Sequence, residues 1–121
     1  RRDLQAVAKE LSRPWDFAKG FDASAPCSAL RPVGEAGHPG DAHISLPVNG
    51  VVRQDGTLHE MIWPVADVIS HISRFVTLAP GDLIYSGTPA GVGALHPGDR
   101  VHGVVEGIAE FDLEVGRPPE M

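Results

Sequence analysis

The sequence predicts a mixed α/β domain that is rich in strands, and three observations point to this fold class. Glycine and proline occur 14 and 11 times in 121 residues, well above the roughly 12% that the two contribute to an average protein. Both residues are unfavourable inside helices and common in tight turns. Segments 43–54 and 109–115 alternate apolar and polar residues as strands do, whereas only two segments have the spacing of an amphipathic helix.

Each of the two helices is predicted from an apolar stripe that lies next to a proline. The first covers 3–12, where apolar residues recur at i, i+3, i+4 and i+7. Pro14 ends it, because a residue before proline avoids the α region. The second runs from Pro64, a favourable first-turn residue, to about Val76, with His71 facing solvent. Its expected buried stripe comprises Val68, Ile69, Ile72, Phe75 and Val76.

The clearest strand signal is a hairpin over 43–54. Asn49-Gly50 matches a type I′ turn, and Asp55-Gly56 is expected to end the hairpin with a second turn. Two further strands, 101–105 and 109–115, are joined by a turn at 106–107. The alternation in the last strand predicts one face against the core and one face against water. The chain then ends in a polar tail, 117–121.

The motif Leu-x-Pro-Gly-Asp occurs twice, at 78–82 and 95–99, and its Pro-Gly step predicts a type II turn in each copy. The first copy leads into 83–85, an apolar run that predicts a short buried strand. A glycine-rich loop follows at 86–93, and it lacks the residues of a P-loop or of a dinucleotide fingerprint. This loop is either a tight connection or a rim that presents the Thr88 hydroxyl to an anionic oxygen.

Lys19 stands between three aromatic residues, Trp15, Phe17 and Phe21. One interpretation is a lysine that buries its aliphatic stem while its ammonium reaches water or Asp22. The other is a desolvated cation that meets a carboxylate or a developing oxyanion, where reduced screening strengthens its effect. The pattern alone leaves both open.

Composition narrows the class of protein. The formal charge of −6, with lysine and arginine scattered along the chain, argues against a nucleic-acid surface. We expect no membrane span, and the single cysteine, Cys27, favours a reducing compartment such as the cytoplasm. The chain is one domain in length, but it opens without methionine inside a helix-like segment, so we expect part of a longer protein. No zinc spacing, Gly-x-Ser-x-Gly elbow or His-Glu-x-x-His motif is present.

An ordered string of motifs resembles the fumarylacetoacetate hydrolase family. Its parts are Arg2-Asp3-Leu4-Gln5, Arg13-Pro14-Trp15, Ala18-Lys19-Gly20-Phe21-Asp22, Val48-Asn49-Gly50 with Arg53-Gln54, Met61-Ile62-Trp63, Gly81-Asp82-Leu83-Ile84, Gly87-Thr88-Pro89 and Gly91-Val92-Gly93. Within the family the string is most similar to the fumarylpyruvate and acylpyruvate hydrolases. It spans nearly the whole chain, which makes it far more specific than any one motif.

The resemblance implies a mixed β-sandwich or β-roll with short helices, of which residues 1–121 are the C-terminal portion, incomplete at its N-terminus. It also implies a homodimer and one Mg²⁺ or Mn²⁺ ion. The family's metal-binding carboxylates and its general-base histidine match no residue of this chain. Four residues match its substrate site: Arg2, Gln5, Lys19 and Thr88. Among these, Lys19 and Gln5 are the expected catalytic residues.

The implied activity is the hydrolysis of the carbon–carbon bond of an acylpyruvate, with fumarylpyruvate as the foremost substrate, in the breakdown of aromatic compounds. Two alternatives stay open. The first is decarboxylation or isomerisation of a related oxo acid, such as oxaloacetate or a homoprotocatechuate intermediate. The second is that these residues, without the metal ligands, form a non-catalytic fragment with exposed sheet edges.

Overall fold

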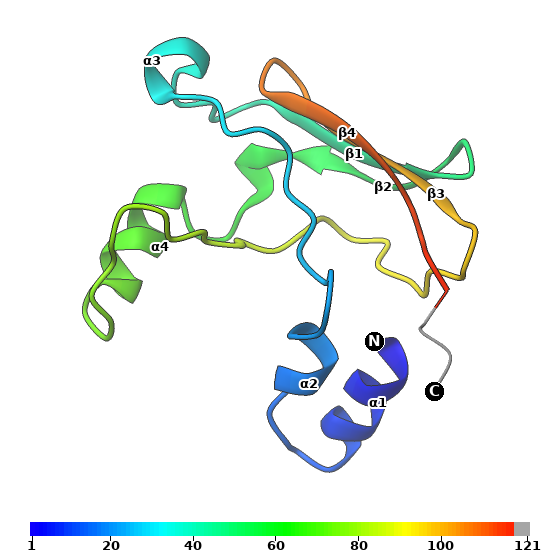
Figure 1. Cartoon of the computed structure of the whole chain (residues 1–121). Coiled ribbons are helices and arrows are strands. Elements are labelled where there is room, and N and C mark those ends of the chain that lie inside the picture. The colour runs from blue at the N-terminus through cyan, green and yellow to red at the C-terminus, as the bar shows by residue number, and fades with distance from the viewer. Residues whose placement is uncertain (118–121) are drawn as a thin grey trace.

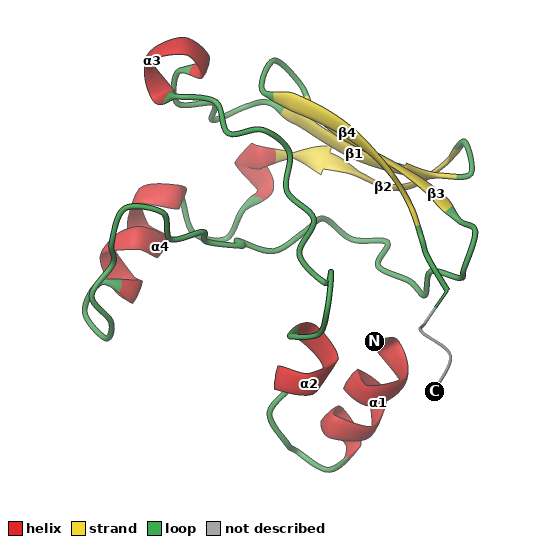
Figure 2. Cartoon of the chain, viewed as in Figure 1, coloured by secondary structure: helices red, strands yellow, loops and turns green. Residues whose placement is uncertain are grey.

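The computed structural model describes residues 1–117, so most of the predicted polar tail lies outside the described residues. A four-stranded antiparallel sheet forms the centre of the chain, and short helices lie around it (Figure 1). The strands are β1 (His43–Val48), β2 (Val51–Thr57), β3 (Arg100–Val105) and β4 (Ala109–Glu114). Their order across the sheet is β2-β1-β3-β4. Figure 2 shows the strands in yellow and the helices in red. The mixed α/β, strand-rich class is confirmed.

The β1–β2 connection is the predicted type I′ turn. Asn49 and Gly50 have φ values of 51° and 78°, and this turn type requires positive φ at both central residues. The Asn49 side chain also joins the hairpin to β3, because its Oδ1 accepts the Arg100 backbone N–H at 2.9 Å and its Nδ2 donates to Asp99 at 2.8 Å. The hydrogen bonds that the Asp99 carboxylate accepts lower its pKa. The largest cause is the bond from the His96 backbone N–H, and the bond from the Asn49 side chain comes next.

We expect Asn49→Ala to lower the free energy of unfolding by about 2 kcal/mol. The variant loses the bond to Arg100 and places an ordinary residue at positive φ, two costs of roughly 1 kcal/mol each. Asn49→Gly is the matched comparison, because glycine loses the same bonds but adopts this φ freely. Urea denaturation of the full-length protein measures both variants. Equal losses in the two would contradict the strain contribution.

Strand β2 is longer than predicted, because the expected second turn at Asp55-Gly56 is wrong. Both residues continue the ladder, with Asp55 opposite Ser45 and Gly56 opposite Ile44. An irregularity appears earlier instead: Leu46 pairs with Gln54 but Pro47 pairs with Val52, so Arg53 is an extra residue. Proline has no N–H to donate to the ladder, which explains a bulge at this point of a central strand.

One face of the sheet is apolar and the other is polar. Directly opposite residues share a face, and the apolar face carries Val48 and Val101, which are 5% and 3% exposed. The polar face carries two cross-strand pairs, His43–Asp55 at 2.7 Å and His102–Asp112 at 2.8 Å. In β4 the residues alternate between half-buried and exposed. The predicted two-faced strand is therefore confirmed.

The helices follow the sequence only in part. The first, α1 (Arg2–Glu10), is confirmed, whereas α2 (Asp16–Lys19) and α3 (Val33–Ala36) lie in segments without a predicted helix. A 3₁₀ turn, η1 (Leu58–Glu60), has a capping box and precedes α4 (Val65–Ile72). Helix α4 begins directly after the predicted proline, Pro64, which is its N-cap, but ends four residues before Val76. No described helix has the length and apolar composition for crossing a membrane.

The predicted buried stripe of α4 is wrong. None of its members is buried, and Phe75 and Val76 are 73% and 54% exposed. Helix α4 stands away from the sheet (Figure 1), so no described element covers this stripe. The accessible surface is 9764 Å², against about 6,300 Å² for a folded monomer of this mass. Many apolar side chains of this chain are therefore exposed instead of being packed against other parts of the protein.

Both Pro-Gly turns are confirmed, and each is closed in the same way. Gly81 and Gly98 have φ values of 100° and 92°, as a type II turn requires. In each turn the aspartate carboxylate accepts a backbone N–H, from Ala79 for Asp82 and from His96 for Asp99, both at 2.8 Å. The strand expected at 83–85 is wrong, because this run pairs with no described strand.

Candidate functional site

Arg2 and Gln5 lie on the first turns of α1 and contact each other. Their i, i+3 spacing places them on one helix face, and an Arg2 guanidinium N–H donates to Gln5 Oε1 at 3.0 Å. This bond uses the acceptor of the Gln5 amide, so the Gln5 NH₂ group is left to donate to another oxygen. The structure thus brings two predicted site residues together as adjacent hydrogen-bond donors.

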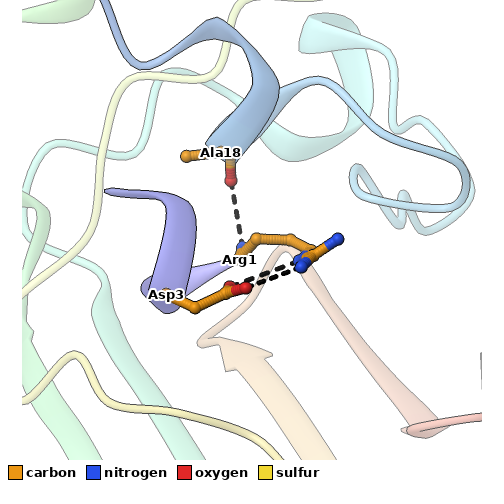
Figure 3. Close-up of polar contacts among 3 residues, drawn as sticks. All are labelled: Arg1, Asp3 and Ala18. Atoms are coloured by element: carbon orange, nitrogen blue, oxygen red, sulfur yellow. Dashed lines mark hydrogen bonds and ion pairs between the residues drawn. The ribbon is translucent and has the colours of Figure 1, made fainter. Parts of the chain in front are cut away.

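Helix α2 is held beside α1 by the residue before α1 (Figure 3). The Arg1 backbone nitrogen donates to the Ala18 carbonyl at 3.0 Å, and Ala18 is only 4% exposed. The Arg1 guanidinium also pairs with Asp3 at 2.6 Å, and this hydrogen bond is the largest cause that lowers the pKa of Asp3 to about 2. The α1–α2 pairing places Lys19, the last residue of α2, near the helix that carries Arg2 and Gln5.

Lys19 is exposed, so of the two interpretations the described residues form the one in which its ammonium reaches water, and not the desolvated cation. Its Nζ lies 6.0 Å from the centroid of the Trp15 ring, at the limit of a cation–π contact. Phe17 and Phe21 do not enclose it, since they are 84% and 46% exposed themselves. Within the described part of the chain Lys19 forms no ion pair, and the alternative contact with Asp22 is also absent.

Thr88 is bound to a residue that sequence reasoning missed as part of the site. Gln54 donates from Nε2 to Thr88 Oγ1 at 2.8 Å and to the Pro89 carbonyl at 2.6 Å. Gln54 is 9% exposed and lies on the apolar face, opposite Leu46. A polar residue at an inward-facing position of the hairpin was the available signal, because buried polar groups need partners.

Gly91 lets the 86–93 loop lie directly on β2. A Cβ on Gly91 would overlap the carbonyl oxygen of Arg53, the extra residue of the bulge. A Cβ on Gly56 would lie at an ordinary contact distance of 3.4 Å from the Pro89 ring, and its close approach is to the Glu60 carboxylate, which lies outside the loop. The bulge, Gly91 and Gln54 therefore fix where Thr88 is presented.

The structure leaves the predicted residues in two groups, Arg2, Gln5 and Lys19 on the helix pair and Thr88 on the loop. One contact relates the segments that carry them: the Tyr85 hydroxyl donates to the Ala25 carbonyl at 3.2 Å. Among the described residues no hydrogen bond joins Thr88 to the helix-borne group. The helix-borne group offers hydrogen-bond donors and positive charge, and Thr88 offers a neutral hydroxyl donor; both suit a ligand with anionic oxygens.

The described surface has a hollow that does not involve the four predicted site residues. A shallow groove of about 450 Å³ lies beside α4, and its lining includes Trp63, His71 and Arg74. His71 is exposed, as predicted, and its ring packs between Trp63 and Phe75 at centroid distances of 5.0 and 5.2 Å. This groove contains none of the four predicted site residues.

The described residues do not fit a divalent metal. In the part of the chain that the structure covers, no three histidine, cysteine or acidic side chains come together as a metal site. The chemistry that these residues can supply is therefore hydrogen-bond donation and positive charge.

The sequence of this strand-rich domain matches a known family. The family model "Fumarylacetoacetate (FAA) hydrolase C-terminal" matches residues 1–115. The chain belongs to the fumarylacetoacetate hydrolase family.

Two curated relatives differ in their activities. The fumarylpyruvate hydrolase of Ralstonia sp is 46% identical over 117 residues, which cover 96% of this chain and 60% of that protein. The mitochondrial oxaloacetate tautomerase FAHD1 of Bos taurus is 38% identical over 117 residues, covering 97% of this chain and 53% of the relative. The family thus includes both hydrolase and tautomerase relatives of this chain.

Two crystal structures share the fold. A Burkholderia cenocepacia protein, provisionally described as a fumarylpyruvate hydrolase, has a TM-score of 0.93 and 64% identity, over 98% of this chain and 53% of that chain. The fumarylpyruvate hydrolase of Pseudomonas aeruginosa, in complex with Mn²⁺ and pyruvate, has a TM-score of 0.91 and 46% identity, over 95% of this chain and 49% of that chain. This chain spans about half to 60% of the length of these four proteins.

Proposed function

We propose that this chain forms part of a hydrolase that cleaves an acylpyruvate, with fumarylpyruvate as the preferred substrate. The observation that carries the proposal is the match of Arg2, Gln5, Lys19 and Thr88 within a chain that is 46% identical to a fumarylpyruvate hydrolase over 96% of its length. An acylpyruvate carries a carboxylate and a 2,4-dioxo system. Its charge and oxygens suit a site of donors and cations.

The reaction adds water across one carbon–carbon bond. Hydroxide adds to the C4 carbonyl, the C3–C4 bond breaks, and its electron pair passes to C3 and the C2 oxygen. The products are a carboxylic acid and a pyruvate enolate, which then takes a proton at C3 to give pyruvate. Charge develops on the C2 oxygen, so a preorganised cation nearby stabilises the transition state.

In this proposal each matching residue has a distinct task. Arg2 binds a substrate carboxylate through its planar fork, and Thr88 donates its hydroxyl to a carboxylate oxygen. The free NH₂ group of Gln5, which is oriented by Arg2, donates to an oxygen at the reacting end. Lys19 supplies the cation for the developing enolate, and its exposure makes its ammonium accessible to substrate.

The enzyme also requires a divalent cation, Mg²⁺ or Mn²⁺, in our proposal. The Mn²⁺ and pyruvate in the Pseudomonas aeruginosa structure support this requirement. Since no described cluster could hold the ion, its ligands are expected outside these residues, and catalysis then needs a longer chain. A homodimeric state and a cytoplasmic location stay predictions.

Turnover of the full-length protein tests the proposal. With Mn²⁺ present, we expect fumarylpyruvate to be hydrolysed with a kcat/KM at least tenfold above that of acetylpyruvate, with fumarate and pyruvate formed in equal amounts. Liquid chromatography of the products measures this. Equal turnover of the two substrates would move the activity to a general acylpyruvate hydrolase, and no turnover of either would refute the hydrolase proposal.

A second function is favoured by the 38% identity to an oxaloacetate tautomerase. Tautomerisation or decarboxylation of oxaloacetate passes through an enolate of the same kind, so the same donors and cation would serve it. The product distinguishes the two reactions. Release of CO₂, or enol–keto exchange without fumarate, would support this second function.

A further inference from the structure

Gln54 is the one buried polar residue among those that the structure describes. It lies on the edge strand β2, next to the bulge at Arg53, and both of its amide N–H groups have partners in the glycine loop. No buried side-chain nitrogen or oxygen in the described residues lacks a partner. The Gln54 NH₂ group thus uses its two N–H donors to hold residues 88 and 89.

The orientation of the Gln54 amide is dictated by Pro89. The Pro89 carbonyl can only accept a hydrogen bond, so the group 2.6 Å from it must be the NH₂ end of the amide. The reversed amide would place two oxygens against each other. Because the same NH₂ group lies 2.8 Å from Thr88 Oγ1, the threonine oxygen is the acceptor of that bond.

This fixed polarity determines what the Thr88 hydroxyl can do. A hydroxyl has one hydrogen to donate, and the hydrogen on Thr88 cannot point toward Gln54, whose own N–H occupies that direction. It is therefore available to an acceptor other than Gln54, and Thr88 is exposed. An oxygen that accepts one bond is also polarised into a better donor.

We infer that Gln54 is a positioning residue that locks the Thr88 hydroxyl as a hydrogen-bond donor to an anionic oxygen, a carboxylate or enolate oxygen of the substrate. The inference rests on the proposed function for the identity of that oxygen. It adds that the donor strength of Thr88 depends on a residue that does not touch substrate.

A double-mutant cycle on the full-length protein tests this coupling. The variants are Gln54→Met, which keeps the volume but removes the donor, Thr88→Val, which removes the hydroxyl, and the two combined. The readout is the dissociation constant of pyruvate, measured by calorimetry with Mn²⁺ present, and it needs no turnover. We expect Gln54→Met and Thr88→Val each to weaken pyruvate binding about tenfold, the scale of one charge-assisted hydrogen bond.

The combined variant decides the outcome. If Gln54 acts through the Thr88 hydroxyl, adding Gln54→Met to Thr88→Val weakens binding by less than about twofold. Thr88→Ser is the matched control: it keeps the hydroxyl, so adding Gln54→Met to it still costs about tenfold. Three results would each overturn the inference. One is a further tenfold loss of pyruvate affinity when Gln54→Met is added to Thr88→Val; the others are an unchanged affinity of Gln54→Met alone and no pyruvate binding by the parent protein. Coupled binding without hydrolysis of any acylpyruvate would support it while refuting the proposed reaction.

Discussion

Replacing Lys19 with methionine in the full-length protein is expected to lower kcat about a hundredfold. This is the scale of removing one preorganised electrostatic group that stabilises developing negative charge. Folding should be nearly unchanged, because Lys19 is exposed and its Nζ lies 6.0 Å from the centroid of the Trp15 ring, at the limit of a cation–π contact. Methionine keeps most of the apolar stem. Steady-state kinetics and a thermal melt measure the two effects.

Lys9 provides the control for Lys19, since it is the other lysine of the chain and is likewise exposed, at the end of α1. Lys9→Met changes the net charge equally, so it should leave kcat within about twofold. If Lys19→Met kept a near-native kcat, the catalytic assignment would be wrong. A large fall in melting temperature instead would indicate that the Lys19 stem has a structural role.

Gly91→Ala is expected to cost at least about 2 kcal/mol of unfolding free energy, because two penalties coincide there. Gly91 has φ of 99°, a region that strains residues with a side chain by roughly 1–3 kcal/mol. A Cβ would also overlap the Arg53 carbonyl oxygen. The loop must therefore lift from β2 and carry Thr88 with it. A displacement of about 1 Å in a binding group can reduce activity about a hundredfold, and we expect kcat/KM to fall on that scale.

Two neighbouring glycines separate these penalties. Gly87 has a similar φ of 103° with open space where a Cβ would lie, so Gly87→Ala measures strain alone. Gly93 has neither feature, and Gly93→Ala should be nearly neutral. Chemical denaturation and kcat/KM of the three full-length variants rank the effects. If Gly91→Ala were no worse than Gly87→Ala, the contact with Arg53 would not position the loop.

Features set by a few adjacent residues followed from the sequence. Asn49-Gly50 fixed the hairpin turn, and both Pro-Gly steps formed the expected turns, because each depends on the φ values that those residues tolerate. Of the site, the Arg2–Gln5 contact is consistent with their i, i+3 spacing on one helix, whereas the role of Thr88 stays a prediction. Such features need no information about distant parts of the chain.

Features that depend on distant residues did not follow. The run 83–85 is as apolar as a buried strand, but a strand forms only with a partner, and no described strand pairs with it. The α4 stripe was misjudged for the same reason, since periodicity shows which side is apolar but not what covers it. The pattern around Lys19 left two interpretations open because it gives the neighbouring residue types but not their positions in space.

Within the site, Gln54 also combines a feature that follows from adjacent residues with one that depends on distant residues. Its sequence neighbours mark it as a strand residue, and nothing local reveals that it binds Thr88, 34 positions later. The bulge opposite Pro47 and the absence of a side chain at Gly91 bring the two segments together. Local residue chemistry therefore determined the Asn49-Gly50 turn, the two Pro-Gly turns and the alternating strands. Contacts between distant segments determined burial and the bond between Gln54 and Thr88, because both depend on atoms that no local pattern encodes.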